Sequence, residues 1–148
     1  MTILGFVFAV LGAIGAALAW LLTEFVGRPF RRFFDLRWEV SRKLVQFDNV
    51  PARAKMVDDT HQEPTGLTEG QDARLTEAQN ALRDLASQIR AFAQAEPFAE
   101  WIVRRVGYDA AEISKALIGY SNEISTYGQM RADFKSRIQT LLRIRAAD

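Results

Sequence analysis

Residues 3–22 read ILGFVFAVLGAIGAALAWLL, an unbroken run of twenty apolar residues with no charge and no hydroxyl group. A helix of this length spans about 30 Å, which matches the thickness of the hydrocarbon core of a bilayer. A segment rich in arginine and phenylalanine follows directly. The run therefore predicts one transmembrane anchor over residues 1–23, with the rest of the chain on one side of the membrane.

A cleaved signal peptide is the alternative interpretation of this run, because residues 17–19 (ALA) resemble a small-x-small cleavage site. Three features oppose it. Only Met1 and Thr2 precede the run, so there is no positively charged n-region, and the run is longer than a usual h-region. A cut after residue 19 would also leave Trp20 inside a continuing apolar stretch. The anchor is therefore the favoured interpretation.

Charge after the run predicts the orientation of the anchor. Residues 24–50 contain six basic and four acidic side chains, and positive flanks stay in the cytoplasm. We expect the N-terminus outside the cell (inner or plasma) membrane and the C-terminal domain in the cytoplasm. Aromatic residues suited to an interfacial belt occur around the end of the run: Trp20, Phe25, Phe30, Phe33 and Phe34.

Small residues recur through the predicted anchor as small-xxx-small pairs, which allow two helix backbones to approach closely. The pairs are Gly5/Ala9, Gly12/Ala16 and Gly15/Ala19. One interpretation is packing of this helix against another membrane helix. The other is that glycine and alanine are simply common in membrane helices.

Residues 24–50 are predicted to form a juxtamembrane basic amphipathic helix, with Pro29 suited to its first position. Its apolar residues share one broad arc, on which Arg37 is an exception. The cations predicted to meet lipid headgroups are Arg28, Arg31, Arg32, Arg42 and Lys43. Periodicity shows an apolar face but not what covers it, so two alternatives stay open: the helix lies on lipid, or it packs on the soluble domain.

Residues 51–67 are predicted to be a linker, because Pro51 disfavours a helix at the preceding residue and the stretch that follows is polar and contains Pro and Gly. His61 is the only histidine of the chain and lies in this segment. A solvated loop histidine is a better interpretation of it than a metal ligand.

Residues 68–148 are predicted to form a soluble helical bundle. Thr68 and Gln71 have the spacing of a capping box. The helix that they open carries apolar residues at steps of 3, 4, 3, 4 and 3, which we call the seam: Leu75, Ala78, Leu82, Leu85, Ile89 and Phe92. The seam covers fewer heptads than a sustained coiled coil needs, so packing inside a bundle is favoured over an intermolecular coiled coil.

Further helices are indicated by their boundary residues. Pro97 suits a helix start and Gly107 a helix stop, and Asp109 is a candidate N-cap for the next helix. A stripe from Ile113 to Tyr127 and a last segment after Gly128 complete the pattern. The fold class predicted is all-α: the anchor, the juxtamembrane helix and a three- or four-helix bundle. We expect residues 66–148 alone to be soluble and helical.

Composition argues against several classes of function. The formal net charge of +1 leaves no excess of cations for bulk nucleic-acid binding. With no cysteine and one histidine, thiolate and multi-histidine metal sites are excluded. The chain carries no phosphate-binding glycine loop, zinc-protease motif or serine-hydrolase motif. We therefore expect no cofactor, no metal and no catalysis, although an enzyme with an unrecognised site is a minor alternative.

These observations predict a membrane-anchored interaction or scaffold protein, whose mechanism is to raise local concentration at the cytoplasmic face of the membrane. Its expected partners are membrane lipid and either another protein or a second copy of itself. The alternative is a small membrane effector or accessory subunit whose transmembrane helix self-associates.

Overall fold

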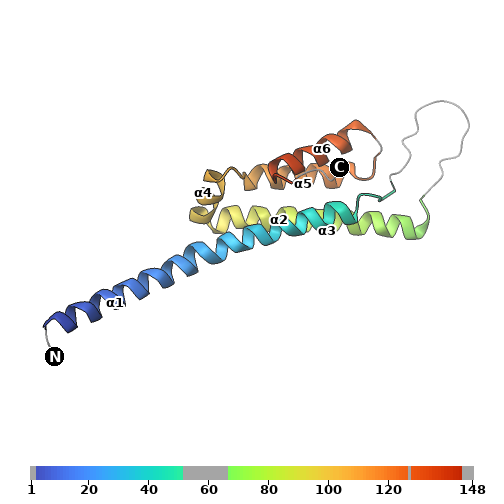
Figure 1. Cartoon of the computed structure of the whole chain (residues 1–148). Coiled ribbons are helices and arrows are strands. Elements are labelled where there is room, and N and C mark those ends of the chain that lie inside the picture. Colours follow the sequence, from blue (N-terminus) through green and yellow to red (C-terminus); the bar gives the residue numbers. More distant parts are fainter. Residues whose placement is uncertain (1–2, 52–66, 127, 145–148) are drawn as a thin grey trace, which may run out of the picture.

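The computed structural model describes residues 3–51, 67–126 and 128–144, and this part of the chain is helical and contains no strand (Figure 1). The predicted all-α class and the long apolar N-terminal helix are confirmed. The elements are α1 (Ile3–Leu22), the π-helical turn η1 (Thr23–Gly27), α2 (Arg28–Gln46), α3 (Glu69–Ala95), α4 (Pro97–Arg105), α5 (Ala110–Glu123) and α6 (Gln129–Leu141). The described residues do not include Tyr127 or residues 52–66 of the predicted 51–67 linker, where His61 lies.

The first three elements form one continuous helical rod (Figure 1). Pro29 lies near the start of α2, as predicted, but no break precedes it. A proline inside a helix lacks an N–H group, and its ring clashes with the carbonyl group four residues earlier. Here the π turn comes just before the proline, and the Arg28 N–H donates to the Thr23 carbonyl oxygen, five residues back. The wider turn accommodates the proline and lets the rod continue.

The second half of the rod belongs to the packed part of the molecule, which we call the helical body (described residues 28–50 and 67–144). Helix α3 contacts α2 on one side and α5 on another, and α5 contacts α6. The side chains that α2 and the turn after it bury in the common core are no more than 7% exposed: Phe33, Leu36, Val40, Leu44, Phe47 and Val50. Of the two alternatives for the apolar face of residues 24–50, the structure shows packing on the rest of the chain.

The seam of α3 and the inner face of α5 form the centre of this core. All six seam residues are buried within the chain. Small residues let the two helices approach, and the buried Ser114 hydroxyl donates to the Ala86 carbonyl oxygen at 2.9 Å. On the other side of α5, a Cβ atom at Gly119 would lie 2.3 Å from Cε1 of Phe134, so this glycine permits the contact with α6.

Arg37, the exception on the apolar arc of α2, caps the last helix. Its Nε donates to the Leu142 carbonyl oxygen at 2.8 Å, and its Nη2 donates to the Arg143 carbonyl oxygen at 3.3 Å. These carbonyl groups lie at the C-terminal end of α6, where helix carbonyls lack partners and the dipole favours a cation. A charged residue on the inner arc of α2 is therefore explained by a partner more than a hundred positions away in the sequence.

The boundary residues act as the sequence predicts. Gln71 accepts a hydrogen bond from the Thr68 N–H at 2.9 Å, and Asp109 accepts one from the Glu112 N–H at 3.0 Å. Gly107 has a φ angle of +92°, and the hydrogen bonds around it are those of a Schellman motif that ends α4. The predicted helix starts at Pro97 and Asp109 and the predicted stop at Gly107 are confirmed.

Candidate membrane-facing site

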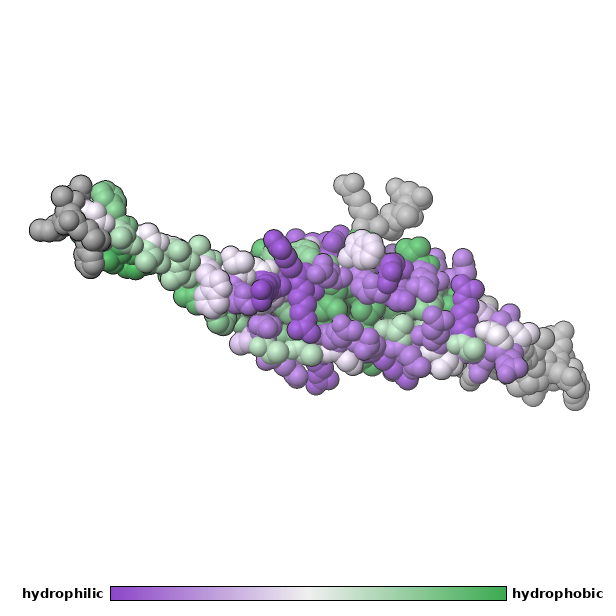
Figure 2. Space-filling view, turned by 90° about the horizontal axis from the view of Figure 1, so that it is seen from below, coloured by the Kyte–Doolittle hydropathy of each residue, from purple (hydrophilic) through white to green (hydrophobic). Residues whose placement is uncertain are grey.

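Helix α1 projects alone from the helical body and exposes its apolar side chains. Phe8 is 67% exposed and Leu11 is 59% exposed. In the space-filling view, hydrophobic residues gather along this projection and hydrophilic residues cover much of the body (Figure 2). The described residues contain one helix long and apolar enough to cross a membrane, and its apolar window is 0% buried. A core helix of a soluble protein would instead be covered by its neighbours.

The small residues of α1 line up along the helix. Gly5, Ala9, Gly12, Ala16 and Ala19 follow at steps of 4, 3, 4 and 3, so they share one face, and Gly15 lies beside it. A Cβ atom at Gly12 or at Gly15 would meet nothing within 4 Å, so no described part of the chain covers these positions. This face is available to another helix.

The polar and charged groups at the end of the apolar run have partners within the helix, and the first unpaired cations follow just beyond it. The Thr23 hydroxyl donates to the Ala19 carbonyl oxygen at 2.9 Å, so its polar group is satisfied within the helix. Glu24 and Arg28 form an ion pair one turn apart. Arg31 and Arg32 are exposed, and within the described residues neither forms an ion pair. The first unpaired charges after the apolar run are therefore positive.

The continuous rod separates the five predicted headgroup cations into two groups. At the α-helical rise, Arg28, Arg31 and Arg32 lie about 9 to 15 Å beyond Leu22 along the helix, whereas Arg42 and Lys43 lie about 30 Å beyond it. The latter distance is about four Debye lengths at physiological salt.

The two distant cations also have partners in the body. Arg42 pairs with Glu39, and its guanidinium lies 5.6 Å from the ring centroid of Trp38. Lys43 donates to the Gln46 side chain at 3.0 Å. Among the five cations, only Arg31 and Arg32 lie close to the apolar helix and form no ion pair or side-chain hydrogen bond within the described residues.

The remaining polar features of the described residues lie away from α1. No group of three or more His, Cys, Asp or Glu side chains is placed to hold a metal within the described residues. The Tyr120 hydroxyl is buried and has no hydrogen-bond partner in the part of the chain that the structure describes. A hydrogen bond from Lys115 and the charges of Lys115 and Arg137 lower the pKa of the partly exposed Glu112 carboxyl, and its ion pair with Arg137 links α5 to α6.

A groove at the far end of the body lies between the end of α2 and the start of α6. Two cations that line it, Arg131 and Lys135, bind groups of neighbouring segments. Arg131 donates to the carbonyl oxygens of Val50, Ile124 and Asp48 at 3.1 to 3.3 Å. Lys135 pairs with the Asp48 carboxylate. Sequence patterns did not single out Arg131, because its partners are backbone carbonyls that only the folded chain brings together.

Comparison with protein-family models, with curated proteins and with solved structures finds no match for this chain. Its function has to follow from its own residues.

Proposed function

We propose that this protein is a single-pass membrane protein that holds a non-enzymatic interaction module, the helical body, at the cytoplasmic face of the cell membrane. The observation that supports the proposal is the continuity of the rod. The exposed apolar helix α1 runs without a break into α2, whose inner face lies in the core of the body. Anchor and module therefore share one rigid element rather than a flexible tether.

A rigid connection has a mechanistic consequence. A body fixed to its anchor presents the same surfaces at the same height above the bilayer, so partners on the membrane meet it at a high effective concentration. The free charges of Arg31 and Arg32 favour the cytoplasm as the side on which the body lies. Membrane lipid and a protein partner, or a second copy, are the binding partners in this proposal.

The absence of cysteine gives a direct test of anchoring and sidedness. In cells, we expect the full chain to stay in the membrane fraction after alkaline carbonate washing. A Thr2→Cys variant should react with a membrane-impermeant maleimide on intact cells, and a Glu69→Cys variant should react only after lysis. Release of the protein by carbonate would contradict the anchor, and the opposite labelling pattern would contradict the orientation.

The interaction role is tested by isolating the tagged full chain from native membranes after mild crosslinking. A foreign protein recovered in stoichiometric amount would support the interaction module. Recovery of the chain alone, at a defined multiple of 16.7 kDa, would support self-assembly instead.

The second candidate function is a membrane effector or accessory subunit that assembles through α1, and the shared face of its small residues favours it. A Gly12→Leu variant should then abolish crosslinked oligomers in membranes, because the added side chain keeps two backbones apart. Ala17→Leu, on the opposite side of the helix, is the matched control and should leave them intact. Equal behaviour of the two variants would argue against association through this face.

A further inference from the structure

Helix α4 has an outer face that is aromatic, cationic and exposed. Its inner residues Ala99 and Val103 are buried. Phe98 and Trp101 are 57% and 51% exposed, and Arg105 follows on the same face at a spacing of four residues. We call Phe98, Trp101 and Arg105 the α4 tip.

The three side chains of the α4 tip form a single surface. The rings of Phe98 and Trp101 stack with centroids 6.0 Å apart and planes 18° apart. The guanidinium of Arg105 lies 5.4 Å from the centroid of the Trp101 ring. The neighbouring Arg104 instead pairs with Glu100 at 3.1 Å and with Asp109 at 3.8 Å, which ties it to the body. The charge of Arg105 is therefore the one presented beside the exposed rings.

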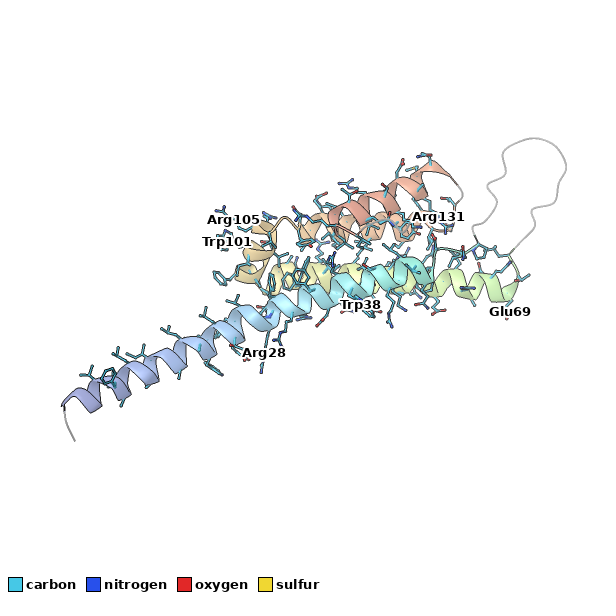
Figure 3. All side chains as sticks on the ribbon, viewed as in Figure 1. Arg28, Trp38, Glu69, Trp101, Arg105 and Arg131 are labelled. Atoms are coloured by element: carbon cyan, nitrogen blue, oxygen red, sulfur yellow. The ribbon has the colours of Figure 1, made fainter. Side chains whose placement is uncertain are left out.

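The fold places the α4 tip at the level where the membrane span ends. Helix α4 contacts η1 and α2 and lies at the end of the body from which α1 projects (Figure 1). Trp101 and Arg105 lie at this end, whereas Glu69 lies at the opposite end (Figure 3). The headgroup layer of one leaflet is about 5 to 7 Å thick, and the five residues of η1 rise about 7 Å beyond the span. An element that touches η1 is therefore at headgroup height.

We infer that the α4 tip docks into the headgroup layer of the bilayer that α1 spans, against anionic phospholipid. Tryptophan concentrates at membrane–water interfaces, where its ring is among acyl chains and its N–H group meets water. Arg105 is placed to meet lipid phosphate, and the free cations Arg31 and Arg32 lie on the adjacent rod. A second contact beside the span would fix the tilt and rotation of the body. This inference rests on the proposed anchoring.

The three tryptophans of the chain allow the test, because they lie at three different heights. Trp20 is within the span, Trp101 is at the α4 tip, and Trp38 lies about 24 Å beyond Leu22 along the rod. Trp38 and Trp101 have similar exposure, 63% and 51%, so Trp38 is a matched control. Three full-length variants would each keep one tryptophan and carry phenylalanine at the other two positions.

Each variant would be reconstituted in vesicles of equal parts phosphatidylcholine and phosphatidylglycerol that carry a nitroxide on the lipid headgroup. We expect quenching of Trp101 to exceed that of Trp38 by about twofold or more, since an interfacial tryptophan lies at headgroup level. In the Trp101-only variant, Arg105→Glu should reduce this quenching. Arg74→Glu, an exposed substitution in the first turns of α3 near the opposite end of the body, should not change it.

The quenching pattern distinguishes docking of the α4 tip from anchoring of the chain by α1. Quenching of Trp20 together with equal quenching of Trp101 and Trp38 would overturn docking of the α4 tip and leave the anchor intact. Failure of lipid nitroxides to quench Trp20 would overturn the anchoring itself. Protection of Trp101 from aqueous acrylamide without quenching by lipid nitroxides would overturn lipid docking in favour of contact with a second copy.

Discussion

A fragment of residues 67–148, which lacks α1 and α2, is expected to lose cooperative folding, whereas residues 28–148 are expected to fold as a soluble helical protein. The reason is that α2 supplies one wall of the core. Its fully buried residues include Phe33, Val40 and Leu44, all at 3% exposure or less. Phe47 and Val50, in the turn that follows α2, are also at 3% exposure or less and are missing from the fragment. Burying one large apolar side chain contributes about 1.5 to 3 kcal/mol, so loss of these five residues removes about 8 to 15 kcal/mol. A domain has a total stability of about 5 to 15 kcal/mol.

The two fragments would be compared by circular dichroism during thermal unfolding and by size-exclusion chromatography. We expect a sigmoidal transition and a monomeric peak for residues 28–148, and a broad transition or aggregation for residues 67–148. A cooperative, monomeric fragment 67–148 would show that α2 is dispensable for the core. That result would also restore the expectation, drawn from sequence, that residues 66–148 fold alone.

Periodicity predicted the helices well because the spacing of apolar residues and the capping residues of each helix lie within that helix or beside it in the sequence. The steps of 3 and 4 along the seam, the cap at Asp109 and the stop at Gly107 are local features, and each is present in the structure. A local signal does not identify the element that covers an apolar face. From the sequence, the apolar face of α2 could therefore lie either on lipid or on the soluble domain. The contacts of Phe33 and Val40 with the rest of the core decide between these alternatives.

Features that depend on distant partners were not predictable in the same way. Arg37 is separated from the carbonyl groups that it caps by more than a hundred residues, and its place on an apolar arc was the only sign of a special role. For the candidate site, the sequence indicated the cations next to the span but could not give their heights. Those heights follow from the unbroken rod. The exposure of Trp101 could not be predicted either, because an aromatic residue in a helical stripe is more often part of a core.

A Phe33→Ala substitution is expected to have the largest effect of any single change on α2, a loss of about 3 to 5 kcal/mol in the free energy of unfolding. Phe33 is 1% exposed, and its ring lies 5.5 Å, centroid to centroid, from each of the rings of Phe34, Phe92 and Tyr108. Truncation removes these ring contacts and leaves a cavity where α2 meets α3 and the loop before α5. Urea unfolding of residues 28–148 would measure the change.

Trp38→Ala is the matched control, since it also removes a large aromatic residue from α2. Trp38 is 63% exposed and its ring is covered only in part, by the Arg42 guanidinium. Its loss should cost no more than about 1 kcal/mol. Equal costs for the two substitutions would contradict the burial of one face of α2. A selective cost at Phe33 would show that the helix continuing the anchor is also a core helix, and in the full chain Phe33→Ala should then loosen the body while leaving the protein in the membrane.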